Sequence, residues 1–389
     1  PLHEYVLEQV ADAARLPPDA VREANLYKSG DVTPFGDKIG VDYNWTVPAM
    51  WAKAKTDWDV DGRRAAIATF NTANRWRKRG LSLLPVKYGI TLSGYKMAST
   101  VRIFADGSVH VVHGGAEVGQ GIHTKVAQAV AFALGCPLAS VAVGDTSAID
   151  APNSDETGGS GTSEACVISV LGACATLGGR LAPYRGAGGW AEAVAAASDA
   201  HENLQAVGWS NVQTGKEHGN FDYCTQGIGC VEVEVDVLTG ELALLRADLL
   251  MDQGAPLNPD VDLGQVEGGF TMALGLFLTE ELLWAADGTQ RNIGSWEYKI
   301  PAAHDIPLAL NVSFLPKAPN PSAVAALRSK ASAEPPMALG AAAFFAACDA
   351  IRSARRDAGV GGALEVDAPL TVERVREACA VAVERFGLR

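Results

Sequence analysis

Hydrophobic and polar positions alternate most regularly in the second half of the chain. Over residues 228–237, valines recur at every second position and acidic residues lie between them. This is the pattern of a strand with one buried face. The turn dipeptide Thr239-Gly240 separates this run from a second strand-like run over residues 241–251. We therefore predict a one-sided antiparallel hairpin here.

A second hairpin is predicted over residues 100–113, and a glycine-rich turn follows it. Residues 114–121 contain four glycines, and apolar residues then recur at helical spacing over residues 126–134. Glycines let the backbone turn sharply and approach a ligand, and the free N–H groups at a helix start can bind an anion. Gln120 adds a side-chain amide that can donate and accept. From these residues alone, the two interpretations, a plain turn and a ligand-binding loop, have equal support.

Other elements follow from the same periodicities. Helices are predicted over residues 2–14, 18–25, 47–65, 165–177, 190–200, 260–283, 337–354 and 371–385. Strands are predicted over residues 81–86, 140–144, 298–306 and 308–316. The chain of 389 residues suits two or three lobes. We expect an α+β (mixed α/β) fold with two lobes of antiparallel or mixed sheets packed with helices.

Two further polar, glycine-containing stretches precede predicted helices. Residues 157–161 could hold an anionic or pterin-like group, or they could form a surface loop in which Ser160 or Thr162 caps the helix. Gln265 lies near three helical glycines, Gly264, Gly268 and Gly269. Glycine costs roughly 1 kcal/mol in a helix, so another helix or a cofactor is expected to pack closely there.

Glu334 precedes a Pro-Pro pair and a strongly apolar helix. Prolines fit the first turn of a helix, and Pro335 is expected to keep Glu334 out of the helical region. Glu334 is then a carboxylate on a rigid corner. From spacing alone, the favoured interpretation is a surface acid near a helix N-terminus, which gains up to ~1 kcal/mol from the helix dipole.

The composition of the chain argues against several classes of partner and of metal site. The net charge of −13 argues against a nucleic-acid partner, and no apolar run reaches the length of a membrane span. The seven cysteines form no CxxC pair, which indicates reduced thiols in a cytoplasmic protein and no iron–sulfur or zinc site. His113, His123 and His218 have no metal-ligand spacing and are expected to be structural. Because the chain begins at Pro1, we expect a fragment or a processed subunit.

Several motifs together are similar to one family. HGGAEVGQGIHTKVAQ resembles the molybdopterin-contacting loop of the xanthine dehydrogenase and aldehyde oxidase family of molybdenum hydroxylases. Other stretches fit that family in the same order: NSDETGGSGTSEA, VEVEVDVLTGEL, DQGAPLNPDVDLGQVEGGF, GLFLTEEL and SKASAEPPMALGAAAFFAACDAIRSAR. The resemblance runs from about Pro1 to the C-terminus. Residues 186–219 match the family least and are expected to form a variable surface excursion.

The resemblance implies a role for each site residue. Glu334 matches the glutamate of the family's GEPP motif, the general base, with Ala333 in place of Gly. Gln120 is implied to orient an oxo ligand or the substrate. The residues implied to bind molybdenum–molybdopterin, whose metal is held by the pterin and not by the protein, are Gly119, Gln120, Gly121, Thr157, Gly158, Gly159, Ser160, Gly161 and Gln265. Leu92 replaces the last aromatic residue of FGISF, which in purine-oxidising members holds the flat substrate ring.

The resemblance also implies the reaction and the partners. An aldehyde or an N-heterocycle would be hydroxylated at a C–H carbon with oxygen from water. Because leucine cannot stack on a ring, Leu92 favours aldehydes over purines. The electrons would leave through 2Fe-2S and FAD centres in other domains or subunits, and the complete enzyme would be a homodimer. Residues 1–84 would continue an upstream molybdopterin subdomain, and residues 85–215 and 216–389 would form two cofactor-binding lobes with the site at their interface.

Two other function classes stay open. The chain could be a catalytically silent relative kept for structure or assembly, although the intact Glu334, Gln120 and Gln265 argue against this. It could also be a simple nucleotide- or phosphate-binding module that uses the two glycine-rich loops. That alternative leaves the Glu334-Pro335-Pro336 corner unexplained.

Overall fold

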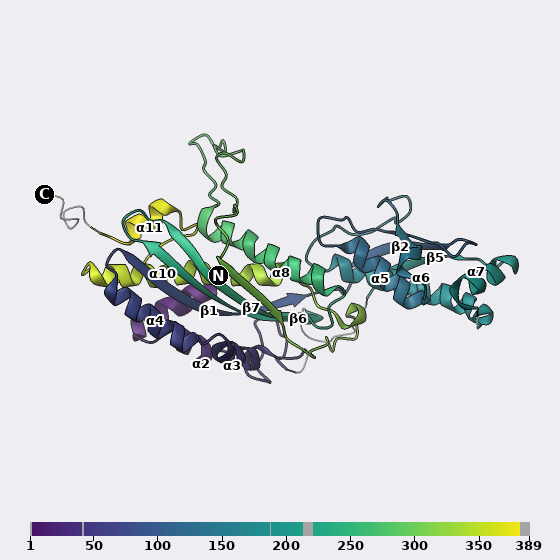
Figure 1. The fold of residues 1–389 in the computed structure, drawn as a ribbon, viewed down its shortest axis with the longest axis horizontal. Coiled ribbons are helices and arrows are strands. Elements are labelled where there is room, and N and C mark those ends of the chain that lie inside the picture. Colours follow the sequence, from purple (N-terminus) through teal and green to yellow (C-terminus); the bar gives the residue numbers. More distant parts are fainter. Residues whose placement is uncertain (1, 41–42, 187, 213–220, 382–389) are drawn as a thin grey trace.

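The chain forms two lobes that lie side by side along the long axis of the molecule (Figure 1). The computed structural model describes residues 2–40, 43–186, 188–212 and 221–381. Each lobe contains one four-stranded mixed sheet packed with helices. The predicted α+β fold of two lobes is therefore confirmed.

The first lobe is built on a sheet with the strand order β1-β6-β7-β8. Its strands are β1 (Arg77–Ile90), β6 (Tyr223–Asp236), β7 (Leu242–Asp252) and β8 (Ala309–Phe314). β6 and β7 pair antiparallel around the turn at Gly240, whose φ is +83°. The predicted valine hairpin is thus confirmed. β8 pairs parallel to β7, which makes the sheet mixed.

Helices cover both faces of this sheet. On one face lie α8 (Pro259–Leu274), α9 (Glu334–Leu339) and α10 (Ala341–Asp357), which share one apolar cluster with the alternating valines of β6. The other face is covered by α3 (Val47–Asp57) and α4 (Val60–Ala73). A Cβ on Gly80 of β1 would collide with the α10 backbone, so this glycine permits the close approach of helix and sheet. The hairpin is therefore buried on both faces along much of its length, so the prediction that only one of its faces is buried is wrong.

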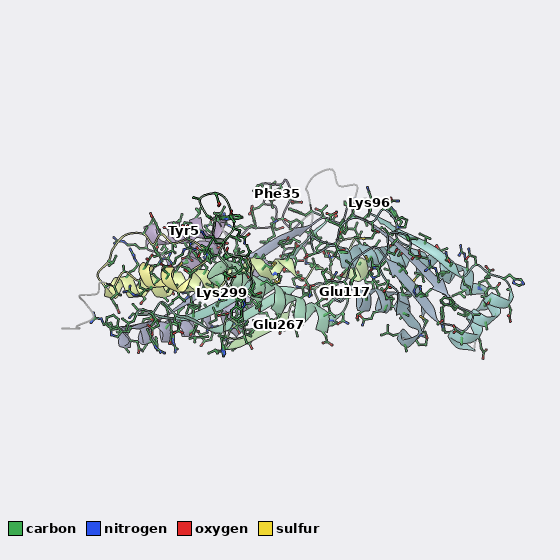
Figure 2. The ribbon with its side chains drawn as sticks, turned by 90° about the horizontal axis from the view of Figure 1, so that it is seen from above. Tyr5, Phe35, Lys96, Glu117, Glu267 and Lys299 are labelled. Carbon is green, nitrogen blue, oxygen red and sulfur yellow. The ribbon has the colours of Figure 1, made fainter. Side chains whose placement is uncertain are left out.

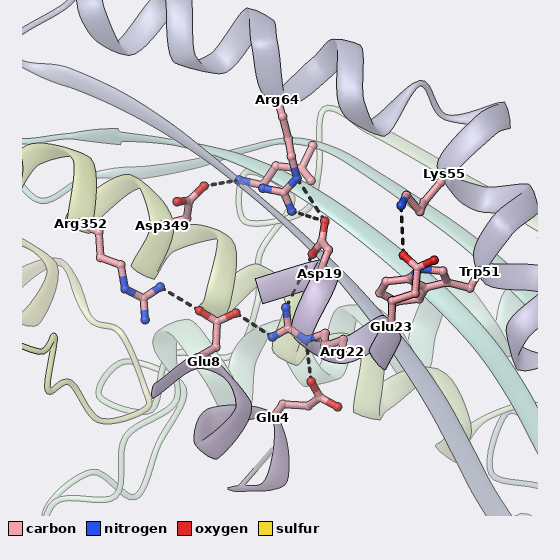
Figure 3. A network of polar contacts seen from close by, with 11 residues as sticks. Glu4, Glu8, Asp19, Arg22, Glu23, Trp51, Lys55, Arg64, Asp349 and Arg352 are labelled. Carbon is pink, nitrogen blue, oxygen red and sulfur yellow. Dashed lines mark hydrogen bonds and ion pairs between the residues drawn. The ribbon is translucent and has the colours of Figure 1, made fainter. Parts of the chain in front are cut away.

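The N-terminal helices join the first lobe through buried charges. Arg22 of α2 (Pro18–Ala24) donates to Glu4 and Glu8 of α1 (Leu2–Ala14) at 2.7 Å each. Arg352 of α10 donates to the other oxygen of Glu8 at 2.8 Å, so the network ties α1 and α2 to α10 (Figure 3). The last helix, α11 (Val372–Ala378), is capped by Thr371 and packs on the same cluster.

The second lobe has a smaller sheet with the order β4-β3-β2-β5. Its strands are β2 (Lys96–Ile103), β3 (Val109–His113), β4 (Val141–Val143) and β5 (Gln205–Asn211). Two helices, α5 (Ile122–Leu134) and α6 (Thr162–Leu181), pack on it, and α7 (Gly189–Asp199) packs against α6 in the same apolar cluster. α5 ends at Gly135 in the left-handed conformation, as its sequence predicts.

Several predicted boundaries are wrong. The helix predicted over residues 47–65 is two helices, because Asp59 adopts a left-handed φ of +47°. The polar stretch expected as a surface excursion contains β5, whose residues 205–211 pair with β2. The α6 N-cap is Gly161 and makes no side-chain capping bond, so neither Ser160 nor Thr162 caps it.

Around α8 the predictions also fail in part. The helix predicted over residues 260–283 becomes a π-helical turn at Gly275–Thr279, after which the chain extends away from the first lobe (Figure 1). Residues 298–306, predicted as a strand, form none. The helix predicted over residues 371–385 ends at Ala378, and residues 382–385 and His218 lie outside the described residues.

Two helical stretches, Thr162–Tyr184 and Glu334–Asp357, are long and apolar enough to cross a bilayer by length and composition alone. The sequence expectation concerned uninterrupted apolar runs, and it is not contradicted, because charged residues interrupt both stretches. Their apolar windows are 50% and 78% buried inside the protein. Because they pack on the sheets of the two lobes, they serve as core helices.

Candidate functional site

One cavity of about 180 Å³ lies where the two lobes meet. Glu117, which precedes α5, marks this junction in the view from above (Figure 2). The second lobe contributes the loop before α5, the loop 157–160 and the start of α6; the first lobe contributes α8 and the segment 329–334. Six of the predicted site residues line this cavity: Gln120, Thr157, Gly158, Ser160, Gln265 and Glu334.

The segments around the cavity also touch one another directly. Gln265 Nε2 donates to the carbonyl oxygen of Gly119 at 3.1 Å, which links α8 to the loop before α5. The backbone N–H of Glu334 donates to Ser160 Oγ at 3.2 Å. The N–H of Ala116 donates to Thr157 Oγ1 at 2.9 Å. The three segments that the sequence singles out therefore form a single wall.

The loop before α5 and the start of this helix use some of their N–H groups to bind the protein's own side chain. The Glu117 carboxylate accepts from the N–H groups of Gly119, Gly121 and His123 at 3.0, 2.9 and 3.3 Å. Burial opposes ionisation of Glu117, but these backbone donors outweigh it and lower the pKa of this carboxyl. The anion site predicted at this helix start is thus filled by the protein's own carboxylate.

Gln120 is held within its own loop. Its Nε2 donates to the Ala116 carbonyl at 2.8 Å, and its Oε1 accepts from the Val118 N–H at 2.7 Å. These two bonds fix the amide plane at the edge of the cavity. The remaining hydrogen of the amide is free for a ligand, since the described residues give it no other acceptor.

Glu334 is the first residue of α9 and is half-buried. This differs from the expectation that Pro335 would keep it outside the helix; Ala333 is the N-cap and is itself in the α conformation. The Glu334 carboxylate lines the cavity and accepts a hydrogen bond from the hydroxyl of Tyr88. It therefore faces protein and cavity and not open solvent.

A buried ion pair that the sequence analysis missed joins the two lobes at the cavity. Lys125 Nζ of α5 lies 2.7 Å from Asp262 Oδ1 of α8, and both side chains are at most 5% exposed. Ser332 Oγ donates to the same oxygen at 3.1 Å. A sequence signal exists, because Lys125 lies between Ile122 and Ala129 on the apolar side of α5. A lysine there needs a buried partner.

Glu164 at the start of α6 is a second missed residue. It is fully buried, and burial raises its pKa to about 7 against the opposing effect of its hydrogen-bond donors. The hydroxyl of Tyr223 donates to it, as do Ser329 Oγ at 3.2 Å and the Ala326 N–H at 3.3 Å. These bonds attach α6 to β6 and to the segment that leads to Glu334.

The segment before Glu334 is fixed by a further buried ion pair. Lys330 Nζ lies 2.8 Å from Asp252 Oδ2, and both side chains are fully buried. Thr46 Oγ1 donates to the same oxygen at 3.1 Å, and Lys330 also donates to Asn44 Oδ1 at 3.2 Å. The end of β7 thereby anchors one wall of the cavity.

The other predicted site residues flank the cavity without lining it: Gly119, Gly121, Gly159, Gly161 and Leu92. Leu92 is only 1% exposed and packs in a small cluster with Ile90, Tyr223 and Ala331. A Cβ on Gly161 would meet its side chain at 3.2 Å. Leu92 therefore supports the loop 157–161 from behind.

No group of three or more His, Cys, Asp or Glu residues is arranged for a metal ion within the described part of the chain. All seven cysteines are buried free thiols. His113 and His123 lie together, with His113 Nε2 and His123 Nδ1 3.0 Å apart. Burial, followed by the charge of His123, lowers the pKa of His113 to about 4.

The cavity is lined by amides, hydroxyls and paired charges. It fits a polar group that carries its own metal ligands.

Comparisons with known proteins agree with this lining. The family described as molybdopterin cofactor-binding domain matches residues 52–307. Xanthine dehydrogenase/oxidase of Gallus gallus is 38% identical over 97% of this chain and 28% of its own length. Aldehyde oxidase 1 of Bos taurus is 39% identical over 97% of this chain and 29% of its own length. The chain therefore spans less than a third of these relatives.

Solved structures share the fold. The aldehyde oxidoreductase from Desulfovibrio desulfuricans superposes with a TM-score of 0.78 at 22% identity, covering 96% of this chain and 40% of that chain. Quinoline 2-oxidoreductase from Pseudomonas putida 86 has a TM-score of 0.79 at 20% identity, covering 97% and 51%. From the family match and the sequence identity, this chain belongs to the xanthine dehydrogenase and aldehyde oxidase family, as a molybdopterin cofactor-binding part.

Proposed function

We propose that the full-length protein is a molybdenum hydroxylase and that this chain supplies its catalytic, cofactor-binding portion. The reaction is hydroxylation of an aldehyde or N-heterocycle C–H carbon with oxygen from water. The observation that carries the proposal is the convergence of Glu334, Gln120 and Gln265 on one cavity at the lobe junction. Three segments far apart in the chain supply these side chains.

The cofactor would be held by hydrogen bonds and close backbone approach. The residues assigned to it are Gly119, Gln120, Gly121, Thr157, Gly158, Gly159, Ser160, Gly161 and Gln265. Positive φ values at Gly119, Gly121, Gly159 and Ser160 support this role, since such turns bring backbone groups close to a ligand. When bound, the molybdenum–pterin group supplies the two-electron redox chemistry. The protein supplies orientation and exclusion of water.

Glu334 is the proposed general base. A base of this kind must be a carboxylate held at a fixed position beside the reacting group. Glu334 meets this condition: its N–H is bonded to Ser160, Pro335 behind it is buried, and its carboxylate is bonded to Tyr88. Gln120, whose amide is fixed by its own loop, would orient the substrate or a cofactor oxygen.

The remaining assignments concern the whole protein. The preference for an aldehyde over a purine rests only on the residue type at Leu92, which is buried and lies outside the cavity lining. Electrons would leave through 2Fe-2S and FAD centres in other domains or subunits of a homodimeric cytoplasmic enzyme. Names of relatives such as xanthine dehydrogenase and aldehyde oxidase support an oxidation reaction. The silent-relative and phosphate-binding alternatives gain no support from the comparisons.

The test is Glu334→Gln in the full-length protein, with turnover measured alongside molybdenum and pterin content. Loss of a general base should lower kcat by roughly 10²–10⁴-fold while cofactor content stays normal. Glu267→Gln is the matched control, because Glu267 lies on α8 but does not line the cavity. Turnover of Glu334→Gln within about tenfold of the wild type would reject the assignment of Glu334 as the base. A full-length protein that contains no molybdenum would support the catalytically silent alternative.

A further inference from the structure

Tyr88 is the side chain that holds the Glu334 carboxylate. It lies near the end of β1, opposite Thr225 of β6, and it packs partly against the apolar clusters on that side of the sheet. Its hydroxyl donates to Glu334 Oε2. The two residues are 246 positions apart in the chain, so the contact depends on how α9 packs across β1.

The contact makes the two oxygens of the Glu334 carboxylate different in their hydrogen bonding. Oε2 is occupied by the phenol, whereas Oε1 has no hydrogen-bond donor among the described residues. The backbone of Glu334 is fixed separately by Ser160, and Pro335 and Pro336 are buried behind it. One oxygen is therefore tied to the protein while the other is left for a ligand in the cavity.

The other ionisable groups that line this cavity already have partners. Lys125 is paired with Asp262, Lys330 with Asp252, and Glu164 is bonded by Tyr223 and Ser329. Burial, followed by the hydrogen bond and charge of Glu334, raises the pKa of Tyr88 to about 12. The phenol therefore keeps its proton and remains a donor over the whole range in which an enzyme works.

We propose that Tyr88 is a positioning residue for the Glu334 carboxylate: its phenol holds one oxygen and orients the other toward the cavity. This inference rests on the proposed function of Glu334.

Tyr88→Phe in the full-length protein tests the proposal, since it removes only the hydroxyl. Without this hydrogen bond to the carboxylate, the acid limb of the kcat/KM profile should move toward higher pH. Turnover at the optimum should fall only a few-fold, with molybdenum content unchanged. A purely structural tyrosine would leave the acid limb where it is.

The matched control is Tyr298→Phe. Tyr298 donates to Glu280 at 2.6 Å, so the variant removes the same kind of bond away from the cavity, and its pH profile should equal that of the wild type. Crystal structures give a readout independent of activity. The Glu334 carboxylate should occupy one position in the wild type and several in Tyr88→Phe.

The failures of the two proposals are distinguishable. If Glu334→Gln is inactive but Tyr88→Phe leaves both the acid limb and the carboxylate position unchanged, only the positioning role is overturned. A wild-type crystal structure with the phenol more than 3.5 Å from Glu334 would overturn it as well. If Glu334→Gln itself stays active, the assignment of the base is wrong and Tyr88 loses the role with it.

Discussion

The carbonyl oxygen of Ala333 lies against Gly269 of α8, so close that a Cβ on Gly269 would stand within 3.0 Å of it. Ala333 immediately precedes Glu334. The sequence pointed to three glycines in this helix as places of close approach, but Gly264 and Gly268 have open space around them. One glycine therefore sets the distance between α8 and the segment that carries the candidate base.

Gly269→Ala should displace that segment. Overlap with a backbone carbonyl typically costs about 1–3 kcal/mol in a packed site, which exceeds the roughly 1 kcal/mol that alanine gains in a helix. We expect a lower apparent unfolding temperature and reduced turnover. Gly268→Ala, the adjacent control, should be neutral or slightly stabilising. Thermal unfolding and activity of both variants provide the comparison, and equal behaviour would contradict the role of Gly269.

Lys330→Met should strongly destabilise the protein. The substitution leaves the fully buried Asp252 without its counter-charge, a change that typically costs about 3–5 kcal/mol. Adding Asp252→Asn should restore part of the loss, because the uncompensated charge is then removed. Denaturant unfolding of the two variants measures this. A double variant no more stable than the single one would show that the ion pair does not hold the segment.

Glu164→Gln should alter how stability depends on pH. Burial raises the pKa of Glu164 from 4.5 to about 7. Between these values the folded protein keeps a proton that the unfolded chain has lost, so the contribution is complete below pH 4.5 and is lost as the pH rises through 7. As the pH rises through that window, the difference in free energy of unfolding between wild type and variant should shrink by up to about 1.4 kcal/mol per pH unit.

His113→Gln should show the opposite trend. The pKa of His113 is lowered from 6.5 to about 4, first by burial and then by His123. Between these values the unfolded chain binds a proton that the folded protein excludes. The contribution is therefore complete above pH 6.5 and is lost as the pH falls through 4. Unfolding titrations should find the stability gap between wild type and variant narrowing toward acid pH; a constant gap would mean that His113 does not titrate in this way.

Short-range patterns predicted much of the fold. The alternating valines, the turn at Gly240 and the helix stop at Gly135 depend on nearest neighbours in the chain, and all three are confirmed. The strand at residues 205–211 could not be predicted, because its polar residues acquire a partner only when β2 lies beside them. The same holds for the break at Asp59, where packing of α3 and α4 on the sheet overrides helical periodicity.

The amino-acid sequence by itself determined the family, the local elements and the residue types that converge on the cavity, since periodicity, turn chemistry and motif order are all local properties of a chain. Only the tertiary structure decided that Lys125 meets Asp262, that Glu117 fills its own helix start and that Tyr88 holds Glu334. The physical reason is that a buried polar group takes whichever partner the packing of the two lobes brings within hydrogen-bond distance. No spacing along the chain encodes that distance.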